Sequence, residues 1–219
     1  MFFDELQRDT EAERQGFLAV ALIQRALRGQ VTRGQYLAFL TEAYHHVRHT
    51  VPLLMACGLR LPGRLAWLRD AVVDYIAEEA GHDRWILDDI ARAGGNADAV
   101  RHGEPNHATE VMVAYAYDGV LRRDPLVFFG MGFVLEGTSV RLATKAAAAL
   151  RAALDLPEAA FTYLRSHGEL DIEHARNLAA LMNRLELPDD RRQVTRAARA
   201  FYRLYGDVFR SIEAASAAQ

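Results

Sequence analysis

Proline and glycine divide the chain into long segments rich in Ala, Leu, Arg and Glu, and this spacing is the strongest constraint on its fold. No segment alternates apolar and polar residues with a period of two for long, so strands are not indicated. The breaks predict where each helix ends. We expect an all-α bundle of seven helices in a single domain, residues 1–219, with the helices near 4–28, 33–58, 63–93, 106–121, 125–153, 157–184 and 188–215.

Charge and cysteine content narrow the class of protein. The 219 residues carry a formal net charge of −3, which argues against a nucleic-acid partner. Cys57 is the only cysteine, as is usual in a reducing compartment. The N-terminus lacks the pattern of a signal peptide, and the longest apolar run, at 126–135, is too short to span a bilayer. We expect a cytoplasmic protein without a membrane partner, and a homodimer stays open.

The stretch HGELDIEH interrupts the apolar stripe of the sixth predicted helix. Residues three or four apart share a helix face, so His167, Asp171 and His174 occupy the middle of this stripe. Leu164 and Leu178 continue the stripe on either side. Burying three ionisable groups on one face is costly unless something pairs them. A bound cation would do so.

Two other predicted helices show the same anomaly. Glu79 and His82 take stripe positions on the third helix, and the Glu-x-x-His spacing lets one helix supply two ligands to a metal pair. Glu78 could also reach His82 at i+4, but it falls off the stripe, so Glu79 is preferred. Glu136 lies on the stripe of the fifth helix, after the very apolar approach FFGMGFVL.

The anomalous positions form one donor set of three carboxylates and three imidazoles: Glu79, His82, Glu136, His167, Asp171 and His174. Oxygen and nitrogen donors without a thiolate suit iron or manganese and argue against a structural zinc site. Six ligands shared by two ions would leave open positions for dioxygen or a substrate. For any single helix the alternative is a satisfied core polar residue or an interhelical salt bridge.

The second predicted helix carries the polar segment TEAYHHVRHT. Glu42 is a candidate additional ligand, whereas His46 and Tyr44 are candidates for the lining of a substrate pocket. Phe129, Phe133 and Tyr44 together suggest that such a pocket is apolar, which favours an acyl chain.

These motifs resemble a known group of proteins. EEAGHDRW, the glutamate in FVLEGTS, and HGELDIEH are similar to segments of the haem-oxygenase-like diiron oxidases and oxygenases, iron-containing redox enzymes related to the TenA and PqqC families. The resemblance spans about residues 33–184 and implies a haem-oxygenase-like bundle. It matches the same six residues to metal-ligand positions. It implies two iron ions, with manganese as a substitute, that activate dioxygen to oxidise a small acyl or amino-acid-derived substrate.

The resemblance leaves other functions open. Haem is not expected, because one proximal histidine would leave the other five ligands unexplained. A TenA-type hydrolase needs a reactive cysteine, and Cys57 lies on the wrong helix and is expected to serve packing. The alternatives are a TenA/PqqC-like protein that acts without a diiron centre, and a non-catalytic metal-binding protein of the same fold.

Overall fold

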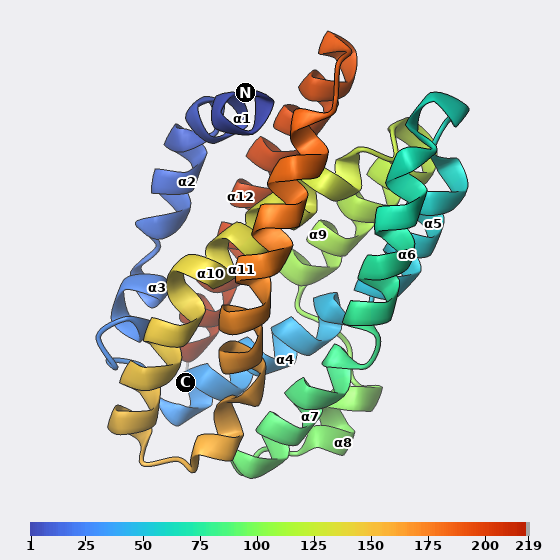
Figure 1. Cartoon of the computed structure of the whole chain (residues 1–219). Helices are drawn as coiled ribbons and strands as arrows, with labels where there is room; N and C mark the ends of the chain where they lie inside the picture. The colour runs from blue at the N-terminus through green and yellow to red at the C-terminus, as the bar shows by residue number, and fades with distance from the viewer. Residues whose placement is uncertain (218–219) are drawn as a thin grey trace.

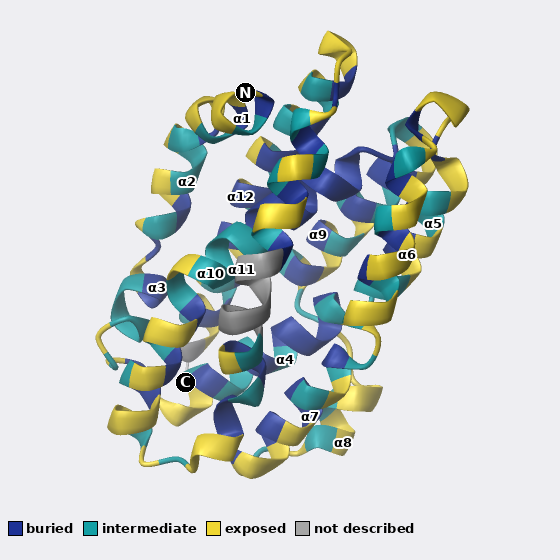
Figure 2. Ribbon diagram, in the orientation of Figure 1, coloured by how far each residue is buried: buried dark blue, intermediate teal, exposed yellow. Residues whose placement is uncertain are grey.

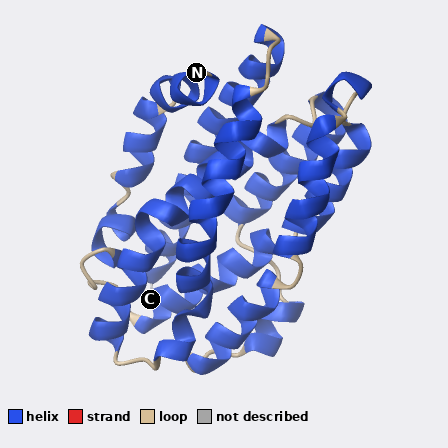
Figure 3. Ribbon diagram, viewed as in Figure 1, coloured by secondary structure: helices blue, strands red, loops and turns tan. Residues whose placement is uncertain are grey.

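The computed structural model describes residues 1–217, except for the side chains of residues 167–173 and 216–217. The described backbone consists of helices and the turns between them, without strands (Figure 3), which confirms the all-α prediction. The α-helices are α1 (Phe2–Asp9), α2 (Glu11–Leu18), α3 (Ala21–Ala26), α4 (Arg33–Val47), α5 (Thr50–Arg60), α6 (Trp67–Glu79), α7 (His82–Arg92), α8 (Ala97–His102), α9 (His107–Asp118), α10 (Val127–Leu154), α11 (Thr162–Asn183) and α12 (Pro188–Ala217).

Helix α10 is the centre of the arrangement, because it packs against both α11 and α12 (Figure 1). Helices α4 and α9 contact α12 and each other, while α5 pairs with α6. Helix α7 contacts both α4 and α11. The short helices α1 to α3 run along one side of the bundle (Figure 1), where α2 and α3 contact α12.

The apolar start of α10 lets that helix approach α12 closely. Residues 127–134 are all buried, and buried positions face the interior along the other helices as well (Figure 2). A Cβ atom on Gly130 would lie 2.6 Å from the Cβ atom of Ala197 and 2.7 Å from the carbonyl oxygen of Val194, so this contact requires glycine. None of the described helices combines the length and the apolar character that crossing a bilayer demands.

Several predicted helices are split, so the expected number of seven was too low. The segment 4–28 forms α1, α2 and α3, the segment 33–58 forms α4 and α5, and the segment 63–93 forms a short 3₁₀ turn followed by α6 and α7. Helix α8 was not predicted at all, because its six residues are too few to show a periodic pattern.

Two of the splits have a clear cause in the backbone. Pro52 has no N–H to donate to the carbonyl of Arg48, so a continuous helix would lose a bond there. The chain instead ends α4 at Val47 and begins α5 at Thr50, which places Pro52 in the first turn, where the missing donor costs little. Gly81 has a φ of 94°, a left-handed conformation that ends α6 and starts α7 in a new direction.

Candidate metal centre and cavity

Glu79 and His82 meet at the break between two helices. Glu79 is the last residue of α6 and His82 is the first residue of α7, so the prediction that one continuous helix presents both was wrong. The turn at Gly81 nevertheless brings the side chains together, with Oε2 of Glu79 3.1 Å from Nδ1 of His82. Both side chains are at most 10% exposed. Trp85 stacks on the His82 ring, with the ring centroids 4.2 Å apart, and so holds its orientation.

His174 reaches the same place from α11, and its side chain is 5% exposed. Its Nδ1 lies 3.9 Å from Oε1 of Glu79, and its Nε2 lies 3.0 Å from Oε2 of Glu78. The carboxylate of Glu79 therefore lies between two imidazoles, one from α7 and one from α11. Glu78 also joins the group, although the sequence pattern set it aside because it falls off the apolar stripe. Its i+4 relation to His82 was the signal in its favour.

Glu136 is linked to this group through Tyr75 of α6. The Tyr75 hydroxyl lies 3.5 Å from Oε2 of Glu136 and 3.4 Å from the carbonyl oxygen of His174, so its single proton can form a long hydrogen bond to either acceptor. Its ring also lies against the His174 ring, at 5.5 Å between centroids. Tyr75 thus joins α6, α10 and α11 at one point. Tyr75 was not among the predicted site residues, because nothing local in the sequence reveals where its hydroxyl points.

Two of the six predicted ligands, His167 and Asp171, belong to the segment 167–173, whose side chains lie outside the described part of the structure. Among the side chains that are described, no group of three or more His, Cys, Asp or Glu residues forms an arrangement that holds a metal by itself. What the described residues do provide is a set of close imidazole–carboxylate pairs.

The chemistry and spacing of these pairs suit a metal ion. Two donor atoms about 2.1 Å from one cation, at right angles to each other, lie about 3 Å apart. The Glu79–His82 contact of 3.1 Å has this separation, whereas the Glu79–His174 separation of 3.9 Å would require a wider angle at the cation. Carboxylate oxygen with imidazole nitrogen is a donor mixture that iron and manganese accept. The residues present therefore fit the metal that the sequence pattern predicts.

A cavity of about 160 Å³ opens beside Glu79 and Glu136. It is lined mainly by apolar side chains, and within the described structure it has no Arg or Lys in its wall. The charged and polar residues of its lining come from α4, α5, α6, α10, α11 and α12: Gln35, Tyr36, His46, Thr50, Tyr75, Glu79, Glu136, Thr138, Ser139, Tyr163 and Tyr205.

The cavity follows α10 for much of its length. Lining residues of that helix run from Phe128 past Glu136 to Leu150. At the C-terminal end of α10 the wall is completed by α3 and the loop after it, where Gly29 packs against the backbone of Ala149. We call the part lined by α10 beyond Ser139, together with α3, the apolar arm.

The residues that we expected to form the apolar lining are not the ones that line the cavity. Phe129, Phe133 and Tyr44 do not line this cavity. Phe133 instead makes edge-to-face contacts with Phe3 and Tyr202, because the cavity-facing side of α10 is rotated from the predicted stripe by about one residue.

The polar residues of α4 face different surroundings. His46 lines the cavity, where its ring lies 5.7 Å from that of Tyr205, and its Nδ1 lies 3.0 Å from the carbonyl oxygen of Glu42. The Glu42 carboxylate does not line the cavity and accepts a hydrogen bond of 3.1 Å from the backbone N–H of Asn106. Burial raises its pKa, an effect that the nearby Thr109 hydroxyl and the bond from Asn106 oppose. Tyr44 is buried beside Arg48, whose guanidinium lies 5.4 Å from the ring centroid.

Comparison with known proteins places the fold. A sequence profile of the iron-containing redox enzyme family matches residues 37–206. No curated protein sequence matches the chain. A domain of unknown function with a haem-oxygenase-like fold from Shewanella denitrificans superposes with a TM-score of 0.86 at 22% identity, over 98% of this chain and 93% of that one.

Two further solved structures share the architecture at lower identity. A TenA homologue from Pseudomonas syringae has a TM-score of 0.79 at 10% identity, over 97% of this chain and 92% of its own. Haem oxygenase-1 from the cyanobacterium Synechocystis, in complex with haem, has a TM-score of 0.74 at 12% identity, again over 97% and 92%. These likenesses confirm the predicted haem-oxygenase-like, TenA-like fold. By its sequence the chain belongs to the iron-containing redox enzyme family.

Proposed function

We propose that this protein is a non-haem iron enzyme that uses dioxygen to oxidise a small organic substrate bound in the cavity. The observation that carries the proposal is the position of Glu79, between the imidazoles of His82 and His174 and at the wall of a largely apolar cavity. Nearly buried ionisable groups are costly in such a place unless a partner satisfies them, and a cation would satisfy both residue types together.

Two iron ions would be held by Glu79, His82, Glu136 and His174, with His167 and Asp171 completing the set. When bound, ferrous iron supplies the electrons for the reduction of dioxygen. The protein's own contribution is orientation: Trp85 holds the His82 ring, and the Tyr75 hydroxyl can donate a long hydrogen bond to one oxygen of Glu136. The apolar wall excludes water from the site.

The lining of the cavity indicates the kind of substrate that it can hold. Its wall of Leu, Ile, Phe, Met and Ala side chains suits an alkyl chain, and it offers no cationic side chain to a carboxylate in the described structure. A substrate carboxylate would therefore sit at the metal end, where the cations are, with its chain in the apolar arm.

The second candidate function is a TenA-like activity that uses a cysteine, and the environment of Cys57 argues against it. Its thiol is buried, does not line the cavity and donates to the carbonyl oxygen of Pro125 at 3.3 Å. Burial raises the pKa of Cys57 to about 12, which suppresses the thiolate that a nucleophile needs. Packing accounts for this residue.

Metal analysis and oxygen uptake test the proposal. Chelator-treated protein is loaded anaerobically with ferrous iron, freed of excess metal and exposed to air-saturated buffer in an oxygen electrode. We expect bound iron and oxygen uptake in the parent protein and the loss of both in His174→Ala, because an imidazole ligand is removed without a break in α11. His107→Ala is the matched control, since that side chain is 88% exposed on α9. Equal iron content and oxygen uptake in both variants would contradict the proposal.

A further inference from the structure

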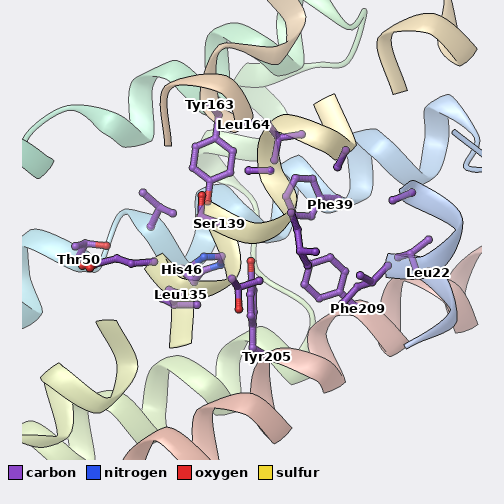
Figure 4. A pocket seen from close by; sticks show the side chains of 18 of the residues that line it. Leu22, Phe39, His46, Thr50, Leu135, Ser139, Tyr163, Leu164, Tyr205 and Phe209 are labelled. Atoms are coloured by element: carbon purple, nitrogen blue, oxygen red, sulfur yellow. The ribbon is translucent and has the colours of Figure 1, made fainter. Parts of the chain in front are cut away.

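A cluster of polar side chains lies within the largely apolar cavity, one turn of α10 beyond Glu136. We call His46, Ser139 and Tyr205 the mid-cavity polar cluster. Figure 4 shows these side chains pointing into the cavity from α4, α10 and α12, with the rings of Phe39 and Phe209 beyond them. The proposed metal centre does not use any of the three, so their place in the wall calls for a separate explanation.

Ser139 is the most informative member. Its Oγ is buried and has no hydrogen-bond partner in the described structure. A serine within a helix can bond back to the carbonyl four residues earlier, but Ser139 does not do so. A buried hydroxyl without a partner costs free energy, and a polar group of a ligand in the cavity would recover it.

His46 adds a polar ring to the same region, and its other side is held by the backbone of α4. Its Nδ1 lies 3.0 Å from the carbonyl oxygen of Glu42, which can only accept, so Nδ1 carries the proton. The Ser139 hydroxyl can donate to a carbonyl oxygen or accept from an N–H. A ligand amide offers both groups, so it can satisfy this hydroxyl in either orientation.

The position of the cluster along α10 sets where that amide lies in the ligand. Ser139 follows Glu136 by one turn, a rise of about 4.5 Å, and the wall continues from Ser139 to Leu150 for about 16 Å. An amide at Ser139 would thus stand a few bonds from a carboxylate at the metal end and carry a long alkyl chain into the apolar arm.

We propose that the substrate is an N-acyl amino acid, with its amide bound by the mid-cavity polar cluster. This inference rests on the proposed function, which places the carboxylate at the metal. Ser139 is then a specificity-determining residue: it favours an amide over a methylene pair at one point of the chain. A chain that is apolar throughout would leave the Ser139 hydroxyl unsatisfied.

Calorimetric titration of manganese-loaded protein tests the inference with two probes of equal backbone length. N-Dodecanoylglycine carries an amide near its carboxylate, whereas pentadecanoate has methylenes there. We expect the parent protein to bind the amide probe about three- to tenfold more tightly than pentadecanoate, the range that one net hydrogen bond provides. Ser139→Ala should remove this preference. Thr144→Ala, an exposed change on the same helix, should retain it.

The outcomes separate the inference from the proposed function. If pentadecanoate binds as tightly as the amide probe, or Ser139→Ala keeps the preference, the amide assignment is wrong while an acyl substrate stands. If neither probe binds, the acyl substrate fails as well, and the iron and oxygen measurements on His174→Ala still decide the metal centre independently.

Discussion

Two glutamates with little exposure, Glu42 on α4 and Glu79 on α6, look alike in the sequence and differ in the fold. Glu42 is 7% exposed, and its carboxylate accepts the backbone N–H of Asn106 at the start of α9. There the partial positive charge of a helix N-terminus also favours a negative group. The side chain of Glu79 is 10% exposed and faces two imidazoles. A buried carboxylate on a helix is therefore not by itself a sign of a metal ligand, because the partner decides its use.

The largest effect that separates the two glutamates is on metal affinity. Glu79→Ala should weaken manganese binding at least about 100-fold, because it removes a ligand rather than a supporting residue. Glu42→Ala should leave manganese binding unchanged but lower the free energy of unfolding by about 1–3 kcal/mol, since the Asn106 N–H loses its acceptor. Competition titration with a metal-sensitive chelator and urea unfolding measure these quantities. An equal loss of manganese affinity in both variants would contradict the different roles proposed for Glu42 and Glu79.

Removal of the metal should have the next largest effect, on thermal stability. Without a cation the clustered carboxylates repel one another, so the chelator-treated protein should be folded but less stable. Saturation with manganese to 100 times Kd should raise Tm by about 5–10 °C. Differential scanning calorimetry should find the same rise in Glu42→Ala and little or none in Glu79→Ala. A parent protein that melts at one temperature with and without manganese would count against the metal centre.

The smallest effect concerns the pH dependence of stability at Glu42. Burial raises the pKa of Glu42 above its ordinary value of 4.5. Because the pKa is raised in the folded state, the contribution of Glu42 to the free energy of unfolding is fully present below pH 4.5. This contribution is lost as the pH rises through the folded-state pKa. Glu42→Gln keeps an acceptor for Asn106 and cannot ionise, so it should gain stability relative to the parent over that rise. The free energy of unfolding is measured by urea titration of both proteins across this pH range. If the pKa of Glu42 were not raised, the free energy would change with pH in the same way in Glu42→Gln and in the parent.

Much of the candidate site followed from local pattern alone. Glu79, His82, Glu136 and His174 were expected on buried helix faces. In the structure Glu79 lies close to His82 and to His174, and Tyr75 lies between this group and Glu136. The helical period of 3.6 residues makes such inward positions visible, because it depends only on neighbours in the chain. The prediction of one continuous helix was wrong at Gly81, where a left-handed turn separates α6 from α7. Such a turn does not change the spacing of apolar residues in the sequence, so the pattern does not reveal it.

The partners of each residue were not predictable in the same way. Glu78 was set aside for lying off the stripe, yet it contacts His174 across the bundle. Glu42 was a candidate ligand, yet Asn106, 64 residues away, takes its carboxylate. Phe133 was expected in the cavity and packs outside it. Each of these outcomes depends on how far one helix is rotated against another, which the packing of the whole core sets.

The sequence by itself therefore determined the all-α fold and the choice of oxygen and nitrogen donors on inward faces, because helix periodicity and side-chain chemistry are local properties. The tertiary structure alone decided that Glu79 rather than Glu42 faces imidazoles, that Tyr75 bridges Glu136 and His174, and that Ser139 looks into a cavity. The physical reason is that these facts concern atoms on different helices, whose separation is fixed only when close packing selects one rotation and one crossing for every helix pair.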